Sequence, residues 1–192
     1  MNDFIRDAGI FAWPLFLCLA LATFIVVERM VALRQSRIIP KHLQDLIISG
    51  TVPTDVDTQS VAGRILLFFQ DPQIDADQLK AYARLQLSKM ERGFFVLEVI
   101  VGAAPLLGLL GTVTGLVEVF ANLSPDTGMP EMGAFREGVA LALTTTMMGL
   151  TIAIPALAFN SYLNRRVDNY AAQLEVAVER LANLKRTKSA LK

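Results

Sequence analysis

The sequence predicts an all-α membrane protein with three transmembrane helices, the second and third of which extend into the cytoplasm. Of the 192 residues, 53% are hydrophobic and 19% are charged, and the mean hydropathy is +0.45, which does not suit a soluble globule. Three stretches with few or no charges are long enough to cross a bilayer. The segments that follow them show helical spacing, and no strand pattern competes with it.

The overall charge and the cysteine count exclude several classes of function. Eighteen Lys and Arg balance eighteen Asp and Glu, so no basic excess points to nucleic acid. The single Cys18 excludes an intramolecular disulfide and a multi-cysteine metal cluster, and the lone His42 excludes a two-histidine metal motif. We therefore expect no cofactor, no metal and no nucleic-acid partner, whereas membrane lipid is an obligatory neighbour.

The first transmembrane helix is expected at residues 9–33, after an N-terminal tail at 1–8. Gly9 to Val27 is a run of nineteen residues without a charge, which at about 1.5 Å per residue covers the roughly 30 Å hydrocarbon core. A cleaved signal peptide is the alternative. It is disfavoured because acidic residues precede the run and no A-x-A site occurs before the next charges.

The second and third transmembrane helices are expected at 94–120 and 137–163. Only Glu98 and Glu118 interrupt the second, near its ends, where they suit interfacial or interhelical charges. The loop at 121–136 contains two prolines and two glycines and is typical of a turn. The two helices should therefore form an antiparallel hairpin.

Residues 34–93 are expected to be a helical region. A short helix is predicted after Pro40, and a second begins at Ser60 after a polar linker. Asp75, with Gln78 three residues later, predicts the start of a third. Apolar residues then recur at helical spacing into the second span, which predicts that this helix enters the membrane unbroken.

The tail at 164–192 continues the helical spacing of the third span. A single helix is expected from Glu137 to about Lys185. Its inner half, beyond the span, carries an apolar stripe that needs a partner surface, formed by Val167, Tyr170, Leu174, Val178, Leu181 and Leu184.

The basic residues predict the orientation. Sixteen of the eighteen Lys and Arg lie in 28–93 and 164–192, and only Arg6 and Arg136 lie in the other two polar segments. The positive-inside rule places the N-terminus in the periplasm and the C-terminus in the cytoplasm.

Small residues and prolines mark the second and third spans. The second carries Gly108, Gly111 and Gly115 near Pro105, and the third carries Gly149 near Pro155. Close helix packing is the plain interpretation of the glycines. A proline in lipid frees a backbone carbonyl, which is tolerated where a neighbour or a water-filled cavity satisfies it.

Hydroxyl groups accompany these glycines. Thr112 lies 20 residues after Arg92, and Thr146 lies 19 residues before Arg165, so the two hydroxyls are expected at one depth. They suit a narrow polar pore, although threonine also bonds to its own helix.

Three sequence motifs together resemble those of a known family. The motifs WPLFLCLALATFIVVER (13–29), APLLGLLGTVTG (104–115) and GVALALTTTMMGLTIAIPA (138–156) are similar to the three signatures of the ExbB/TolQ family, in the MotA/TolQ/ExbB proton channel superfamily, with the same order and topology. The resemblance implies a pore-forming scaffold subunit of an ion-driven motor in the bacterial inner membrane. It implies a homo-oligomer, typically a pentamer, around a single-span ExbD/TolR-like partner, with H⁺ or Na⁺ as the transported ion and no enzymatic activity.

The resemblance also assigns residues. Thr112, Thr145 and Thr146 match the ion pathway, and Pro105 and Pro155 match helix-bending prolines. Many relatives have a glutamate where this sequence has Leu141. Glu137, one turn earlier, either replaces that carboxylate or is an interfacial charge.

The sequence has three alternative functional interpretations. A flagellar-type stator is disfavoured because such proteins usually have four spans. An intramembrane protease is disfavoured because none of the expected spans contains aspartate or histidine. A non-conducting three-span scaffold predicts that the threonines can be replaced without loss of energy coupling. If the chain does conduct, the missing carboxylate predicts that the proton-exchanging acid belongs to the partner, and it favours sodium more than in relatives that carry the glutamate.

Overall fold

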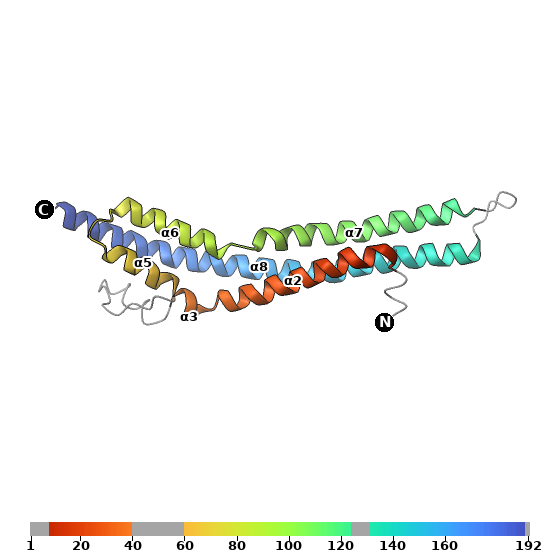
Figure 1. Cartoon of the computed structure of the whole chain (residues 1–192), viewed down its shortest axis with the longest axis horizontal. Coiled ribbons are helices and arrows are strands. Elements are labelled where there is room, and N and C mark those ends of the chain that lie inside the picture. The colour runs from red at the N-terminus through yellow and green to blue at the C-terminus, as the bar shows by residue number, and fades with distance from the viewer. Residues whose placement is uncertain (1–7, 40–59, 124–130, 191–192) are drawn as a thin grey trace. The chain divides into compact units, whose positions relative to one another are not determined.

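The computed structural model describes residues 8–39, 60–123 and 131–190 (Figure 1). Nearly all of these residues are helical, and this part of the chain contains no β-strand. The elements in chain order are η1 (Gly9–Phe11), α2 (Ala12–Ala32), α3 (Gln35–Ile38), α5 (Val61–Gln70), α6 (Ala76–Met90), α7 (Phe94–Ala121) and α8 (Met132–Ala190). The predicted all-α fold class is confirmed.

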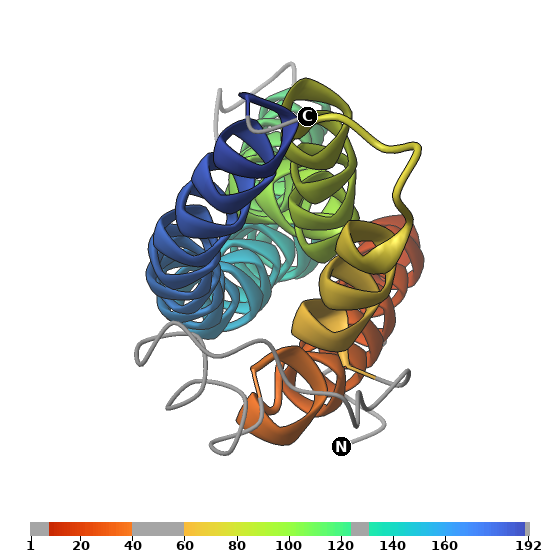
Figure 2. The same ribbon diagram turned by 90° about the vertical axis from the view of Figure 1, so that its left-hand side faces the viewer.

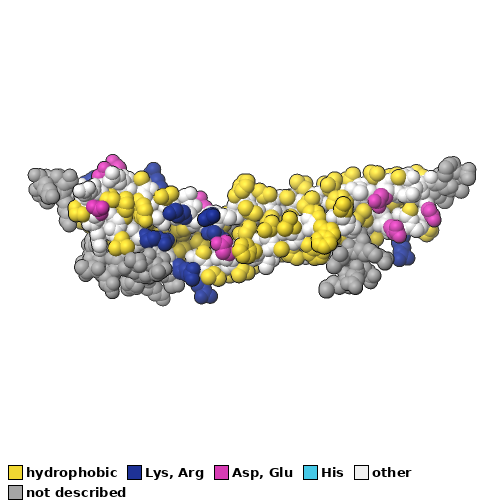
Figure 3. All heavy atoms as spheres, in the orientation of Figure 1, with side chains coloured by type: hydrophobic (Ala, Val, Ile, Leu, Met, Phe, Trp, Pro, Cys, Tyr) yellow, Lys and Arg dark blue, Asp and Glu magenta, His cyan; other side chains and the backbone are white. Residues whose placement is uncertain are grey.

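Three of these helices, α2, α7 and α8, contain stretches long and apolar enough to cross a membrane. Many of their outward-facing side chains are apolar too: Trp13 is 80% exposed, Leu106 65% and Leu143 68%. Hydrophobic side chains cover the visible face of these segments in Figure 3. A large apolar surface of this kind is stable in lipid and invites aggregation in water. The chain is therefore a membrane protein with three candidate spans, as predicted.

Internal contacts divide the chain into two compact units. The first, here called the apolar unit, comprises residues 1–27 and 93–161, and the second, the polar unit, comprises 28–92 and 162–192. Residues 1–7 of the predicted tail lie outside the described residues.

In the apolar unit, α7 and the first part of α8 run antiparallel and side by side (Figures 1 and 2). Helix α7 ends at Ala121 and α8 begins at Met132, inside the range predicted for the loop. Residues 124–130 of that loop lie outside the described residues. The predicted hairpin is confirmed.

The helix predicted to enter the second span unbroken is interrupted, so that prediction is wrong. Helix α6 ends at Met90 and α7 begins at Phe94. Between them Gly93 has a φ of +90°, a backbone region that glycine adopts readily and other residues rarely do. The apolar periodicity continues across the break, which explains why the pattern alone predicted one helix.

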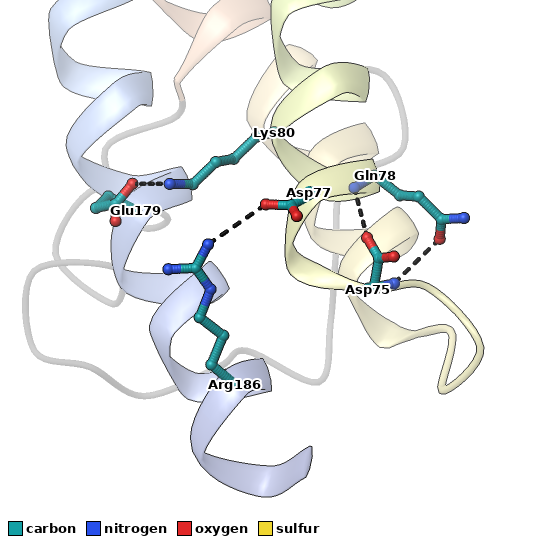
Figure 4. Close-up of polar contacts among 6 residues, drawn as sticks. All are labelled: Asp75, Asp77, Gln78, Lys80, Glu179 and Arg186. Atoms are coloured by element: carbon teal, nitrogen blue, oxygen red, sulfur yellow. Dashed lines mark hydrogen bonds and ion pairs between the residues drawn. The ribbon is translucent and has the colours of Figure 1, made fainter. Parts of the chain in front are cut away.

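In the polar unit, two helix starts match the prediction. The Ser60 hydroxyl accepts a hydrogen bond from the Gly63 N–H at 3.0 Å and caps α5. The Asp75 carboxylate accepts from the Gln78 N–H at 2.7 Å, and Gln78 Oε1 accepts from the Asp75 N–H at 3.1 Å, which completes a capping box (Figure 4). The helix predicted after Pro40 and the linker that follows it lie outside the described residues.

Helix α8 is a single helix of 59 residues, which confirms the prediction of one helix through span and tail and extends it at both ends. Of the predicted stripe, Leu184 is 41% exposed and the other members are buried: Val167, Tyr170, Leu174, Val178 and Leu181. Lys185 Nζ donates to the carbonyl oxygens of Asp71 and Ile74, both at 2.6 Å, so the turn between α5 and α6 contacts the end of α8. The chain itself thus supplies a partner surface for its tail.

Candidate functional site

Glycines bring the backbones of α7 and α8 into direct contact. A Cβ atom at Gly108 would lie 2.8 Å from the carbonyl oxygen of Thr145, and one at Gly149 would lie 2.5 Å from that of Ala104. Real Cβ atoms do not approach so closely, so only glycine fits at these two positions. The glycines assigned to close packing are all buried along the length of α7 and α8: Gly108, Gly111, Gly115 and Gly149.

Thr145 lies inside this helix contact. Its side chain has no exposed surface, and a Cβ atom at Gly111 would overlap it. The hydroxyl has carbonyl oxygens of its own helix at 2.8 Å (Leu141) and 3.2 Å (Ala142), and the carbonyl of Gly108 in α7 at 3.3 Å. A hydroxyl donates one hydrogen bond, and the shortest distance favours Leu141. The structure therefore places Thr145 between the two helices, where it is fully buried.

Thr112 and Thr146 are each half-buried on the hairpin. The Thr146 hydroxyl donates to the Gly108 carbonyl at 3.3 Å, and the Thr112 hydroxyl donates to the Leu109 carbonyl at 2.6 Å. Thr146 thus lies opposite Gly108, four residues before Thr112, which separates the two hydroxyls by about one helical turn, or roughly 5 Å. Counting from the basic residues predicted one depth for both threonines, and the structure agrees with this prediction to within about one turn.

Both helix-bending candidates lie inside continuous helices. Pro105 is half-buried within α7, and Pro155 is exposed within α8. Proline has no N–H, so neither can donate to the carbonyl four residues earlier, at Val101 and Thr151 respectively. Each span therefore offers one carbonyl oxygen without its regular helical donor.

Leu141 and Glu137 differ in their surroundings. Leu141 is 9% exposed, and its Cδ1 atom lies 3.5 Å from where a Cβ atom on Gly9 would be, so it packs against the start of the first span. Glu137 is exposed. The position that resembles the family's carboxylate site thus holds a packed apolar side chain.

The ionisable side chains are distributed unevenly between the units. Every ion pair found among the described residues lies in the polar unit, including Lys80–Glu179 and Asp77–Arg186, which join α6 to α8 (Figure 4). The hydrogen bond from Lys80 has the largest effect on the pKa of Glu179 and lowers it, and the positive charge of Lys80 acts in the same direction. In the described part of the chain, no group of three or more His, Cys, Asp or Glu side chains is arranged to hold a metal ion.

Comparison with known proteins decides the family. A match to the MotA/TolQ/ExbB proton channel family covers residues 57–176, more than half of the sequence. The chain belongs to this family. It is 31% identical to biopolymer transport protein exbB1 of Vibrio cholerae, over 88% of this chain and 82% of that protein. It is also 31% identical to biopolymer transport protein ExbB of Aquifex aeolicus, over 66% of this chain and 84% of that protein. A third relative, biopolymer transport protein ExbB of Helicobacter pylori, is 38% identical over 45% of this chain and 61% of its own length.

Within this MotA/TolQ/ExbB chain, sequence reasoning missed two features of the hairpin. One is the break at Gly93, which a glycine after Glu91 and Arg92 could have signalled. The other is the position of Glu98, which the sequence analysis interpreted as an interfacial or interhelical charge. Its spacing of fourteen residues from Thr112 places both on one face of α7, a signal already present in the sequence.

Proposed function

We propose that the chain is the pore-forming scaffold subunit of an ion-driven motor in the bacterial inner membrane. It assembles as a homo-oligomer, a pentamer, around the transmembrane helices of a single-span ExbD/TolR-like partner. Cation flow down its electrochemical gradient moves that partner, which energises transport or other work at the cell envelope. The names of the relatives, biopolymer transport proteins, support the transport role.

The observation that carries the proposal is the pair of half-buried hydroxyls, Thr112 and Thr146, on a hairpin whose outward surface is otherwise mostly apolar. A cation in the hydrocarbon core needs oxygen ligands or an ionisable group, because an uncompensated charge there costs at least several kcal/mol. These hydroxyls and the carbonyls left free by Pro105 and Pro155 supply oxygen at several depths. Thr145 supports the hairpin from inside and belongs to its packing.

Leu141 indicates which of the two chains carries the proton-exchanging acid. A hydroxyl does not exchange a proton near neutral pH, and the carboxylate position is occupied by a packed leucine. The acid that exchanges protons at the depth of the threonines therefore belongs to the partner helix, and the threonines supply its polar surroundings. A pathway of hydroxyls and carbonyls also suits Na⁺, which makes sodium more plausible here than in relatives that carry the glutamate.

The orientation is part of the proposal. The N-terminus and the loop between α7 and α8 face the periplasm, and the polar unit faces the cytoplasm, because sixteen of eighteen basic residues lie in 28–93 and 164–192. Replacing Asp126 in that loop with cysteine tests it. In intact cells, an impermeant thiol reagent should label this cysteine from outside, and labelling from the cytoplasmic side alone contradicts the orientation.

Crosslinking tests the pore assignment. In a Cys18→Ser background, cysteines at Thr112 and Thr146 should crosslink to the partner helix, because both face the enclosed partner. Leu143→Cys is the matched control, since Leu143 lies in the same span and is 68% exposed on an apolar surface. It should give no crosslink to the partner.

Two outcomes contradict the assignment. If Thr112→Cys and Thr146→Cys react only with lipid-soluble reagents, the hydroxyls face lipid. If all three cysteines crosslink equally, the partner is not enclosed by this surface. Full energy coupling after both threonines are replaced by valine would favour a non-conducting scaffold.

A further inference from the structure

Glu98 is a carboxylate inside a membrane-spanning helix. It lies four residues after Phe94, the first residue of α7, which is about 6 Å along the helix axis. Its side chain is exposed and takes part in none of the ion pairs found among the described residues. Charged side chains within transmembrane segments almost always face a protein interior or a water-filled cavity, because exposure to lipid is costly. The surface around Glu98 therefore indicates what it faces.

Three groups of residues on helix α7 indicate what Glu98 faces. The first packs against α8 and consists of buried residues: Leu97, Ala104, Gly108, Gly111 and Gly115. The second is apolar and 49 to 75% exposed, as expected of a lipid-facing surface: Phe95, Val99, Leu106, Leu110, Val113 and Val117. The third contains Glu98, and its members recur at the three- and four-residue steps that keep side chains on one face: Glu98, Gly102, Pro105, Leu109, Thr112 and Leu116.

This third face offers oxygen ligands and space near Glu98. Pro105 cannot donate to the carbonyl of Val101, which lies three residues after Glu98, so a carboxylate and a free carbonyl share one helical turn. Among the described residues, no atom would lie within 4 Å of a Cβ atom at Gly102, so the surface of the chain beside them is open. Further along the same face is the half-buried hydroxyl of Thr112. Carboxylate, carbonyl and hydroxyl oxygens are ligands for hard cations, not for lipid tails.

We propose that Glu98 lines the cytoplasmic mouth of the cation pathway and binds the transported cation there. This inference rests on the proposed function, which supplies the pathway and its orientation. In the homo-oligomer, the copies of Glu98 form a ring of carboxylates, the arrangement that concentrates and selects cations in channels. The cation passes between this ring and the depth of Thr112 along the open face of α7.

Glu118 provides a matched control on the same helix. It is exposed and lies twenty residues after Glu98, about five and a half turns, so it projects from nearly the opposite side of α7. Thr114, one turn before it, donates its hydroxyl to the Leu110 carbonyl at 2.9 Å. If any charge near the membrane surface were sufficient, replacing either glutamate should have the same effect on cation flux. If Glu98 lines the mouth of the pathway, only its replacement should lower the flux.

Thiol labelling tests whether the face is aqueous, independently of any ion flux. In the Cys18→Ser background of the full chain with its partner, Glu98→Cys should react with a water-soluble thiol reagent from the cytoplasmic side. Phe95 is 75% exposed and lies on the apolar face of the same turn. Phe95→Cys should react at least about tenfold more slowly than Glu98→Cys, because thiolates form poorly in lipid. Equal, slow reaction at both positions overturns the inference even if the proposed function holds.

Cation flux tests the role of the carboxylate. In vesicles containing chain and partner, Glu98→Gln should lower flux by about tenfold or more, because the attraction of a carboxylate for a cation a few ångströms away is lost. Glu98→Asp should retain most of the flux, and Glu118→Gln should match the wild type. Wild-type flux in Glu98→Gln overturns the inference. No flux in the wild-type complex overturns the proposed function instead, and the labelling result then still decides whether Glu98 lies in water.

Discussion

Helix α8 runs through both units and is held in each by a different kind of contact. In the apolar unit it meets α7 through glycines and through Thr145, whose hydroxyl stays within the two backbones. In the polar unit the same helix buries large side chains such as Leu174 and Leu181 and forms ion pairs with α6. One continuous helix thus changes its mode of packing along its length.

The difference reflects the surrounding solvent. In water, burying a leucine is favourable because it removes apolar surface from water, by roughly 25 cal/mol per Å². In lipid that gain is absent, since lipid tails are as apolar as leucine, so association depends on close approach and on hydrogen bonds. The glycines of the hairpin and the leucines of the tail are two solutions to the same packing problem.

The largest expected effect follows from a charge placed in the leucine contact. Leu174 is 2% exposed, so Leu174→Asp should destabilise the polar unit by about 3 kcal/mol or more, because the carboxylate must be buried or the helix must detach. The loss of stability is measured by denaturing the purified full chain and using protease cleavage of the polar unit to monitor its unfolding. Val176→Asp is the control, since Val176 is 58% exposed and should change stability by less than about 0.5 kcal/mol. Equal effects would mean that the stripe is not packed as described.

A side chain added to the glycine contact should have the next largest effect. Gly111→Val should cost about 1 to 3 kcal/mol and separate α7 from α8, because its Cβ atom would overlap Thr145. A disulfide crosslink between the two helices and thermal unfolding in lipid both report it. At Gly133, by contrast, an added Cβ atom would have no atom of the described residues within 4 Å, so Gly133→Val should be tolerated. If Gly111→Val leaves the crosslink intact, the hairpin does not depend on glycine contact.

The smallest effect is expected at the exposed ion pair of Lys80 and Glu179. Because the pKa of Glu179 is lowered in the folded chain, the pair stabilises it above the ordinary glutamate pKa, and this stabilisation is lost as the pH falls through the folded-state value. Glu179→Gln should remove this loss of stability at acidic pH, and salt should weaken the ion pair in the wild type. Unfolding curves recorded between neutral and acidic pH at two salt concentrations decide it. A pH response that survives Glu179→Gln must come from another group.

The sequence predicted those parts of the fold that depend on local chemistry. The caps at Ser60 and Asp75 are set by residues three positions apart, and the spans by long apolar runs with few charges. The break at Gly93 was missed because apolar residues recur at helical spacing on both sides of it. The positive φ angle at Gly93 therefore interrupts the helix although the apolar periodicity continues across it.

The site was predicted less completely, for geometric reasons. Successive helix residues differ by about 100° in direction, so Thr145 and Thr146 face different surroundings although they are adjacent in sequence. Only the packing of α8 against α7 decides which of them is buried. The pairing of Thr146 with Gly108 likewise depends on how the two helices are aligned, which counting from the flanking arginines gave to within about one turn.

Cation flux in reconstituted vesicles tests the central claim, that this chain supplies the pathway and its partner supplies the exchanging acid. Three preparations are compared under the same imposed cation gradient: the chain alone, the ExbD/TolR-like partner alone, and the two together. Flux is expected only when both are present, because Leu141 leaves the hairpin without the central carboxylate and its threonines cannot exchange a proton. Rapid flux through the chain alone, or none through the complex, would contradict it.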